Sequence, residues 1–299
     1  MSLRHRILTI LIVGTTHCAW APTAPAQTVE FLARIDSAQE VPPNTSPARG
    51  IGVFAVDTVT DVVSYRILFS GLSAAETVAH IHGFAPPGVN AGVLNALALG
   101  SPKCGTWNYA ATQEPGILAG TTYVNIHSTA FPGGEIRGQI AETPIHGSFC
   151  HGDGSSVACP CGNNSALGDA EGCLHSGGMG GRLRGYGQAS IANDRVVVHA
   201  LRLPPTTQGL LFQGSGPQPA ALFGDGQRCV AGPIVRLGVK TACNGQIVWP
   251  EPGDPSLSIA GSVLPSTVPT YQVWYRNPAA FCTASTFNLT NAIRVAWAP

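Results

Sequence analysis

The stretch IGVFAVDTVTDVVSYRILFS, residues 51–70, decides the fold class. Its first half alternates residue by residue between two faces of an extended chain, as β-branched and aromatic residues do in strands. In its second half Tyr65, Ile67 and Phe69 share one face, which repeats the period of two. The segment DTVTD (57–61) between the halves is typical of a hairpin connection. The stretch therefore predicts two antiparallel strands.

Composition extends this prediction to the whole chain. Charged residues make up 11%, whereas Gly 36 and Pro 24 are abundant, which favours short strands and tight turns. No run of ten or more residues has a helical period with caps. Further strand-like runs are RVVVHALRL (195–203), LLFQG (210–214), PIVRLGV (233–239), TYQVWYR (270–276) and AIRVAWA (292–298). We therefore expect an all-β protein.

The N-terminus reads as an export signal. Arg4 and Arg6 precede the apolar run ILTILIVGTT, which is too short to span a bilayer. Small residues place cleavage after Ala26, so residues 1–26 are predicted to be a signal peptide; Ala21 is disfavoured because proline follows it. No later segment is long and apolar enough for a membrane span. We expect a secreted, periplasmic or cell-surface protein.

Residues 28–142 resemble the CHRD domain, the module named after chordin. The matching pieces are FLARIDSAQEVPP (31–43), GIGVFAVD (50–57), VSYRILFSGL (63–72), VAHIHGFAPPGVNAGV (78–93) and AGTTYVNIHSTAFPGGEIRGQI (119–140). The resemblance implies an antiparallel sandwich like those of immunoglobulins and superoxide dismutases. It implies no catalytic residue, and in the animal protein such modules belong to an extracellular antagonist of growth-factor signalling.

Residues 148–299 form a second predicted domain, after a change in composition at about 143–148. This part resembles a Cys- and Gly-rich β module at the C-terminal end of exported bacterial proteins, and we expect a disulfide-bonded, sandwich-like fold. Residues 27–142 carry five basic and nine acidic side chains, and residues 143–299 carry nine and seven. Neither balance provides the basic face that nucleic-acid binding needs.

Three histidines are candidate metal ligands. His80 and His82, two apart in AHIHGF, project from the same face of a strand, and His127 shares a face with Asn125 on a later strand. If these strands are neighbours, the three imidazoles converge. Such a set suits zinc or copper. AHIHGF is also similar to the His-x-His strand of copper–zinc superoxide dismutases, so redox activity is one interpretation.

A structural role is the other interpretation of these histidines. They could fasten the Gly/Pro-rich segment 83–92 or the backbone around FPGGE through hydrogen bonds, as buried polar groups require. A dismutase site also needs more ligands, including a bridging His and an Asp, whereas residues 28–142 contain three histidines. Glu135 and Arg137 share a face as well. We expect an ion pair across strands there, rather than a role for Arg137 in guiding an anion to a metal.

Eight cysteines remain after Cys18 leaves with the signal, and export favours disulfides over a zinc knot. Cys159 and Cys161 point to opposite faces if extended, so they should have different partners. Our expected pairs are Cys150–Cys161, Cys159–Cys173, Cys229–Cys282 and Cys104–Cys243, the last of which would join the two domains.

Two functions remain open at this point. The absence of Gly-x-Ser-x-Gly, phosphate-loop and His-Glu-x-x-His motifs favours a non-catalytic binding or structural module that recognises an extracellular protein or surface polymer. The alternative is a zinc- or copper-binding protein that uses His80, His82 and His127, with or without redox activity. Enzyme activity is the less favoured of these expectations.

Overall fold

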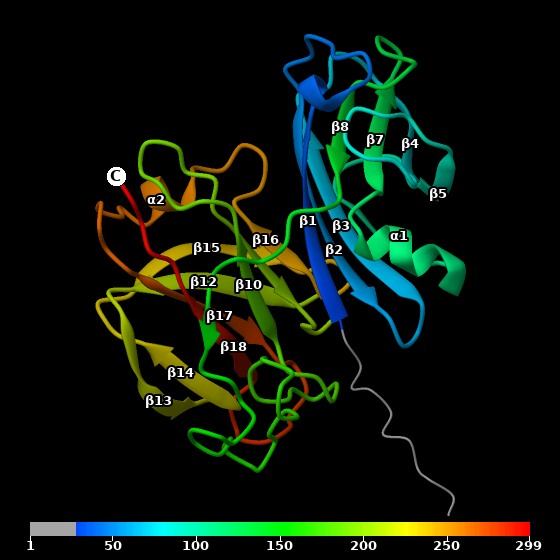
Figure 1. Cartoon of the computed structure of the whole chain (residues 1–299). Helices are drawn as coiled ribbons and strands as arrows, with labels where there is room; N and C mark the ends of the chain where they lie inside the picture. The colour runs from blue at the N-terminus through cyan, green and yellow to red at the C-terminus, as the bar shows by residue number, and fades with distance from the viewer. Residues whose placement is uncertain (1–27) are drawn as a thin grey trace, which may run out of the picture.

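The computed structural model describes residues 28–299, and Figure 1 shows two β-rich parts that lie against each other. The predicted signal peptide, residues 1–26, lies outside the described residues. Antiparallel strands dominate, as expected, and the helices are single turns. Within residues 28–299, no helix is long and apolar enough to cross a membrane.

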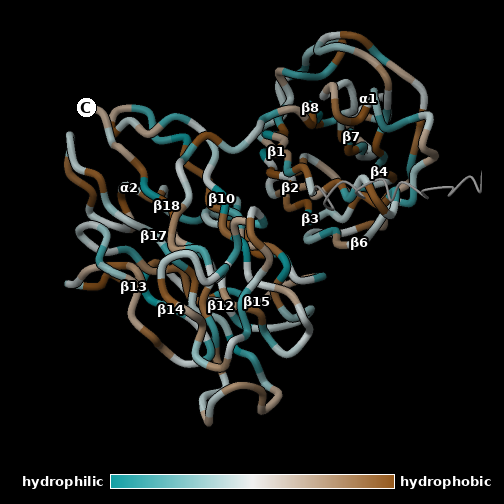
Figure 2. The backbone as a smooth tube through the Cα atoms, turned by 60° about the horizontal axis from the view of Figure 1, so that its bottom comes forward, coloured by the Kyte–Doolittle hydropathy of each residue, from teal (hydrophilic) through white to brown (hydrophobic). Residues whose placement is uncertain are grey.

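The first domain is one eight-stranded sheet in the order β5-β4-β7-β8-β1-β2-β3-β6. Its strands are β1 (Thr28–Asp36), β2 (Arg49–Asp57), β3 (Val62–Ser70), β4 (Glu76–His82), β5 (Val93–Leu97), β6 (Lys103–Asn108), β7 (Tyr123–Ser128) and β8 (Ile136–Gln139). Short helical turns are η1 (Ser37–Gln39), η2 (Ala111–Gln113) and α1 (Glu114–Leu118). Figure 2 shows these strands around a common interior, so the sheet curls into a nearly closed barrel.

The hairpin predicted from residues 51–70 is β2 and β3, and its two faces have different neighbours. Phe54, Tyr65 and Ile67 are buried in the interior of the curled sheet. The opposite face is apolar too, because Ile51 and Val53 pack against the second domain. Alternation therefore predicts both strands, and the apolar outer face reflects the domain contact.

The second domain packs two antiparallel sheets, of order β10-β11-β16 and β15-β12-β17-β18-β9, beside the hairpin β13-β14. The elements are β9 (Ser148–Phe149), β10 (Arg182–Tyr186), β11 (Val197–Leu201), β12 (Gln208–Gly214), β13 (Pro217–Phe223), β14 (Gly226–Val230), β15 (Val235–Thr241), β16 (Ile247–Trp249), α2 (Leu257–Ala260), β17 (Thr270–Arg276) and β18 (Phe287–Arg294). Val198 and Trp249 of one sheet meet Leu211, Tyr271 and Val273 of the other in a single core. This arrangement is the expected sandwich-like fold.

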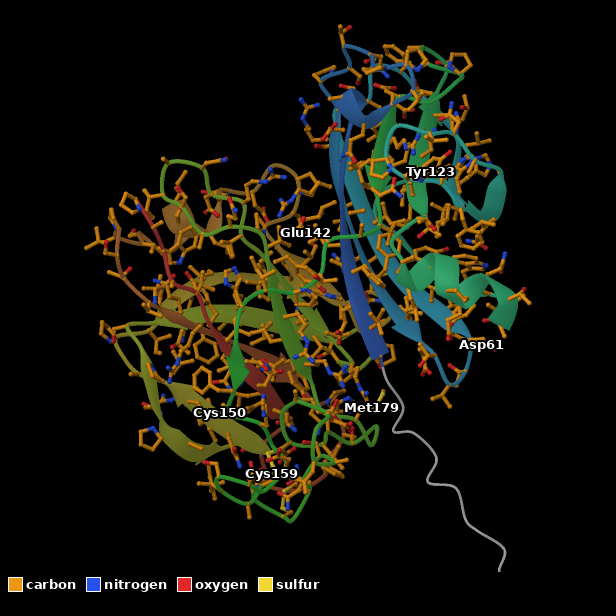
Figure 3. All side chains as sticks on the ribbon, viewed as in Figure 1. Asp61, Tyr123, Glu142, Cys150, Cys159 and Met179 are labelled. Carbon is orange, nitrogen blue, oxygen red and sulfur yellow. A yellow bond between two sulfur atoms is a disulfide. The ribbon has the colours of Figure 1, made fainter. Side chains whose placement is uncertain are left out.

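All eight cysteines of the described chain form disulfides, and two of the expected pairs are confirmed. Cys104 bonds to Cys243, across the two domains, and Cys159 bonds to Cys173. Cys159 and Cys161 have different partners, as expected. The labelled Cys150 and Cys159 lie in the lower part of the second domain in Figure 3.

The other two expected pairs were wrong. Cys150 bonds to Cys229 rather than Cys161, because β9 joins β18 at the sheet edge and brings the chain beside β14. Cys282 bonds to Cys161 and not to Cys229, because the loop after β17 folds back over residues 161–163. Sequence spacing did not predict these two pairs, because the short edge strand β9 determines where Cys150 lies.

The domains meet through a buried apolar cluster and several polar contacts. The cluster consists of Leu32, Ile51, Val53 and Leu68 from the first domain with Tyr186, Val197 and Val248 from the second. Around it, Arg182 pairs with Glu30 at 2.8 Å and Arg66 with Glu251 at 2.7 Å. Together with the Cys104–Cys243 bridge, these contacts fix the two domains as one body.

Candidate metal centre

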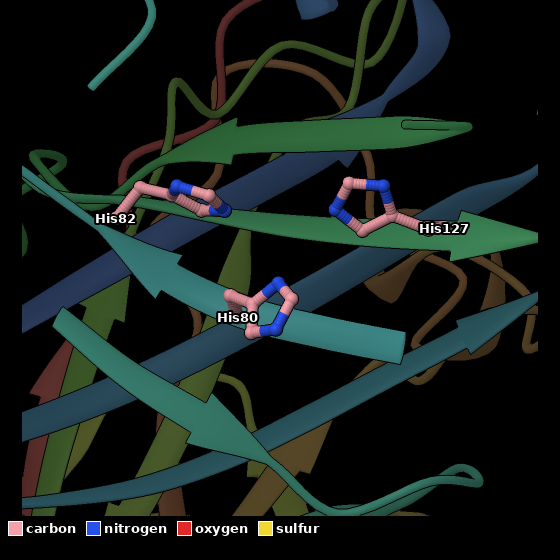
Figure 4. A group of neighbouring side chains, drawn as sticks. All are labelled: His80, His82 and His127. Atoms are coloured by element: carbon pink, nitrogen blue, oxygen red, sulfur yellow. The ribbon is translucent and has the colours of Figure 1, made fainter. Parts of the chain in front are cut away.

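The three histidines lie on the outer face of the first sheet, on two neighbouring strands. On β4, Ala79 and Ile81 enter the core, so His80 and His82 point outward. On β7, burial of Val124 and Ile126 turns His127 to the same outer face. The strands pair antiparallel as expected, and Figure 4 shows the side chains gathered over them.

The register brings the three rings together. His80 lies opposite Asn125, and Val78 lies opposite His127, so His80 is the diagonal neighbour of His127. The ring centroid of His80 lies 5.4 Å from that of His82 and 5.6 Å from that of His127. One ring nitrogen of each residue lies within 4.8 Å of the other two. No fourth His, Cys, Asp or Glu joins this group in residues 28–299.

Hydrogen bonds to backbone carbonyls set the tautomers of two rings. Nδ1 of His82 lies 3.0 Å from the carbonyl of Ala91, and Nδ1 of His127 lies 3.0 Å from the carbonyl of Pro132. A carbonyl oxygen only accepts, so Nδ1 donates its proton in both contacts. The neutral rings then carry their lone pairs on Nε2, which points into the cluster.

The nitrogens that face the cluster have no protein partner. Nε2 of His82, Nε2 of His127 and Nδ1 of His80 are buried and make no hydrogen bond. A buried polar atom without a partner costs free energy, and here three such nitrogens face one point. A metal-bound histidine commonly donates its other ring N–H to a backbone carbonyl, as His82 and His127 do here. The residues present therefore fit a transition-metal ion.

Burial keeps two of the imidazoles in the neutral form that binds metals. Desolvation lowers the pKa of His80, and the neighbouring His127 lowers it further. Desolvation also lowers the pKa of His82, against the raising effect of its hydrogen bond to Ala91. Both rings are therefore neutral at pH 7, with a lone pair free for coordination.

The structural role expected for the histidines is present in the same side chains. The Ala91 and Pro132 carbonyls belong to the segment 83–92 and to the loop around FPGGE. Asn125, which shares a face with His127, donates to the side chain of Glu40 and not to a loop backbone. The Nδ1 atoms thus fasten loops while the facing nitrogens stay free, so the two interpretations are compatible.

A stack of side chains supports His82. The ring of Tyr123 lies parallel to it, with centroids 4.9 Å apart, and the Arg137 guanidinium lies 3.5 Å from the Tyr123 centroid. Arg137 also donates to Asn90 and to the carbonyl of Val89, which holds the loop above the site. These contacts restrict the rotation of the His82 ring.

The expected ion pair between Glu135 and Arg137 does not form. Glu135 instead accepts from the Ser46 hydroxyl at 2.6 Å and the Ser73 backbone N–H at 2.6 Å. These residues share a face, but Glu135 precedes β8 and turns toward the other loops. Face sharing alone did not predict the partner.

Glu40 is a neighbour of the site that sequence reasoning missed. Its side chain is buried beside Asn125, which donates to Oε2 at 3.5 Å, while Oε1 of Glu40 and Oδ1 of Asn125 have no partner. Burial raises the pKa of Glu40 to about 7, against the lowering effects of Arg137 and Asn125. No local sequence signal marks Glu40, because its contact with Asn125 joins two residues that are 85 positions apart in the sequence.

The first domain is thus an antiparallel β module with a cluster of three histidines on its outer face. Residues 31–140 match the CHRD family, so this part of the chain is a CHRD domain. Comparisons with curated proteins and with solved structures find no match. A CHRD domain and four disulfides are consistent with an extracellular or secreted protein.

Proposed function

We propose that this protein is an extracellular, non-catalytic binding module whose CHRD domain holds one zinc or copper ion at His80, His82 and His127. The observation that carries the proposal is the set of three buried, unpartnered ring nitrogens within 4.8 Å of one another. Each would lie about 2.0–2.1 Å from a bound zinc ion. To reach that distance, the three nitrogens would move closer together than the 4.8 Å within which they lie here.

Zinc and copper follow from the chemistry of the donors. Imidazole suits both ions, whereas calcium and magnesium select oxygen ligands. Three protein ligands leave a coordination position for water or for a side chain of a partner. The ion would in this way contribute to binding an extracellular protein or polymer. The proposal is restricted to binding, because a copper–zinc pair needs more ligands than the three histidines supply.

The test is the metal content of the full chain. The protein is produced in an oxidising compartment, purified without a histidine tag or chelators, and analysed by elemental mass spectrometry before and after exposure to zinc and to copper. We expect about one equivalent of one of these metals, and loss of that metal in His80→Ala and His127→Ala.

The matched control is His151→Ala, which removes a half-buried histidine bonded to Ser148 outside the site. This variant should keep the metal. A folded wild-type protein that takes up neither zinc nor copper from excess would refute the proposal. Equal metal loss in the control would refute the assignment of the site.

A further inference from the structure

A groove opens on the second domain, on the face of the five-stranded sheet that turns away from the sandwich core. Its volume is about 910 Å³. The floor consists of Leu210 and Phe212 of β12 with Trp274 of β17. The hairpin β13-β14 packs on β17 and β18 and supplies Phe223 and Arg228 to one wall. Ile234 and the first residues of β15 form the other wall. Figure 1 shows where the hairpin lies in the second domain.

The walls expose large apolar side chains. Phe223 on the hairpin is 43% exposed, and Ile234 and Val235 on the opposite wall are 39% and 38% exposed. Apolar side chains gathered around a concavity differ from the scattered exposed residues of an ordinary surface. The groove therefore offers an apolar surface against which a hydrocarbon chain can be buried.

The charged groups of the groove are both arginines. Arg228 lies near the Phe223 ring, with its guanidinium 5.9 Å from the centroid, and Arg236 extends from β15. Neither forms an ion pair with a carboxylate in residues 28–299, whereas Arg34, Arg66 and Arg182 all do. Two unpaired guanidinium groups beside an apolar floor attract an anion, and their fork geometry suits a carboxylate.

We propose that this groove binds an amphiphilic carboxylate, with its hydrocarbon chain on Phe212 and Trp274 and its head on Arg228 and Arg236. The lining has no amide, hydroxyl or carboxylate side chain, so its side chains provide no acceptors for the many hydroxyl groups of a glycan. The apolar floor matches the hydrocarbon chain of a fatty acid, and the two arginines match its carboxylate. This site is independent of the histidine cluster, which lies in the other domain.

The experiment titrates the full chain with decanoate, below its micelle concentration, and with decanol as the uncharged analogue. Trp274 reports binding by fluorescence, because it lines the groove, whereas Trp107, Trp249 and Trp297 are buried in the cores. Calorimetry measures the same binding without the fluorophore. We expect saturable binding of one decanoate, at least about tenfold tighter than decanol.

Substitutions separate the two parts of the site. Arg228→Gln combined with Arg236→Gln should weaken decanoate about tenfold or more and leave decanol unchanged. Phe223→Ser should weaken both ligands. Trp274→Phe should remove the fluorescence change and keep the calorimetric binding. The matched controls are Arg294→Gln, an exposed arginine over Phe149, and Phe281→Ser, an exposed loop phenylalanine.

Three results would overturn the proposal. The first is a folded protein without saturable decanoate binding, or with equal affinity for decanol. The second is self-association that Phe223→Ser abolishes, because the groove would then be an interface between copies. The third is binding to phosphatidylglycerol vesicles without binding to free decanoate, which would assign the groove to a membrane surface.

Discussion

In His82 and His127 the two ring nitrogens lie in different surroundings. Nδ1 donates to a loop carbonyl, and Nε2 faces the cluster without a partner. A substitution can therefore remove one of these functions and keep the other, which distinguishes a metal ligand from a loop fastener.

His127→Asn should lose the metal and keep the fold. The amide nitrogen of asparagine occupies about the place of Nδ1 and still donates to Pro132, whereas no atom replaces Nε2. His127→Ala should lose the metal and also about 1 kcal/mol of stability, the usual value of one hydrogen bond. Metal analysis and urea unfolding of both variants check this. Metal retained by His127→Asn would contradict the assignment.

The cluster should titrate below the ordinary histidine pKa. Burial lowers the pKa of His80 and His82 from 6.5, so both protonate only at more acidic pH than free histidine. Stability of the metal-free protein should fall as pH drops below about 6.5, where the unfolded chain takes up more protons. NMR titration of the imidazole protons measures both midpoints. A midpoint above 6.5 for either ring would disprove this prediction.

Glu40→Gln should stabilise the protein at alkaline pH. The pKa of Glu40 is raised from 4.5 to about 7, so the folded state holds a proton that the unfolded state has lost, and stability falls as pH rises through this window. The variant avoids that loss, which corresponds to about 3 kcal/mol at about pH 8. Urea unfolding at about pH 4.5 and about pH 8 tests it. A gain of equal size at both pH values would rule out titration as the cause.

Much of the residue-scale site could be predicted from alternation. Because Ile81 and Val124 must enter the core, the histidines beside them must point outward together. The strand register could not be predicted, since it depends on the chain between the strands. The partners of Glu135 and Arg137 were missed for a related reason: loops from distant residues supply them.

At the scale of elements, the loop between β7 and β8 shapes one side of the site. Gly134 has a φ of +133°, and a Cβ there would lie 2.7 Å from Asn125 Oδ1 and 2.7 Å from Glu40 Oε2. The neighbouring Gly133 has nothing within 4 Å of such a Cβ. The close approach of the loop to the sheet therefore depends on one glycine and not on the other.

Gly134→Ala should destabilise the protein by about 2 kcal/mol or more, through backbone strain and displacement of two buried side chains. Gly133→Ala should change stability by less than about 0.5 kcal/mol. Urea unfolding of the pair measures the difference. Equal effects would show that the loop adapts to a side chain at either position.

Strands with a clear apolar alternation or apolar run were the easiest to predict. The run 270–276 coincides with β17, and residues 51–57 fall within β2. β10 was missed, because two residues of its short sequence RLRGY are arginines and the strand shows no apolar alternation. Its Arg182 is buried against Glu30 of the other domain, and a contact of that kind has no local signature.

At the scale of the whole molecule, the domain interface should make unfolding cooperative. The apolar cluster around Val53 and the buried Arg182–Glu30 pair link the two cores. Differential scanning calorimetry should show one transition. Replacing both Cys104 and Cys243 by serine should lower stability by about 2–4 kcal/mol and keep the single transition.

The matched control replaces Cys159 and Cys173, which close a loop with a sequence separation of 14, against 139 for the bridge between the domains. Two transitions in the protein without the interdomain bridge would show that the disulfide alone couples the domains. Two transitions in the wild type would refute the cooperative interface.

The order of the disulfides along the chain has a consequence for biosynthesis. Cys104 and Cys150 leave the ribosome long before Cys243 and Cys229, and Cys161 must wait for Cys282, near the end of the chain. An oxidant that joined cysteines as they emerged would trap incorrect pairs. Correct pairing therefore needs thiols that stay exchangeable until Cys282 has been synthesised, and a disulfide isomerase should raise the yield of the folded protein.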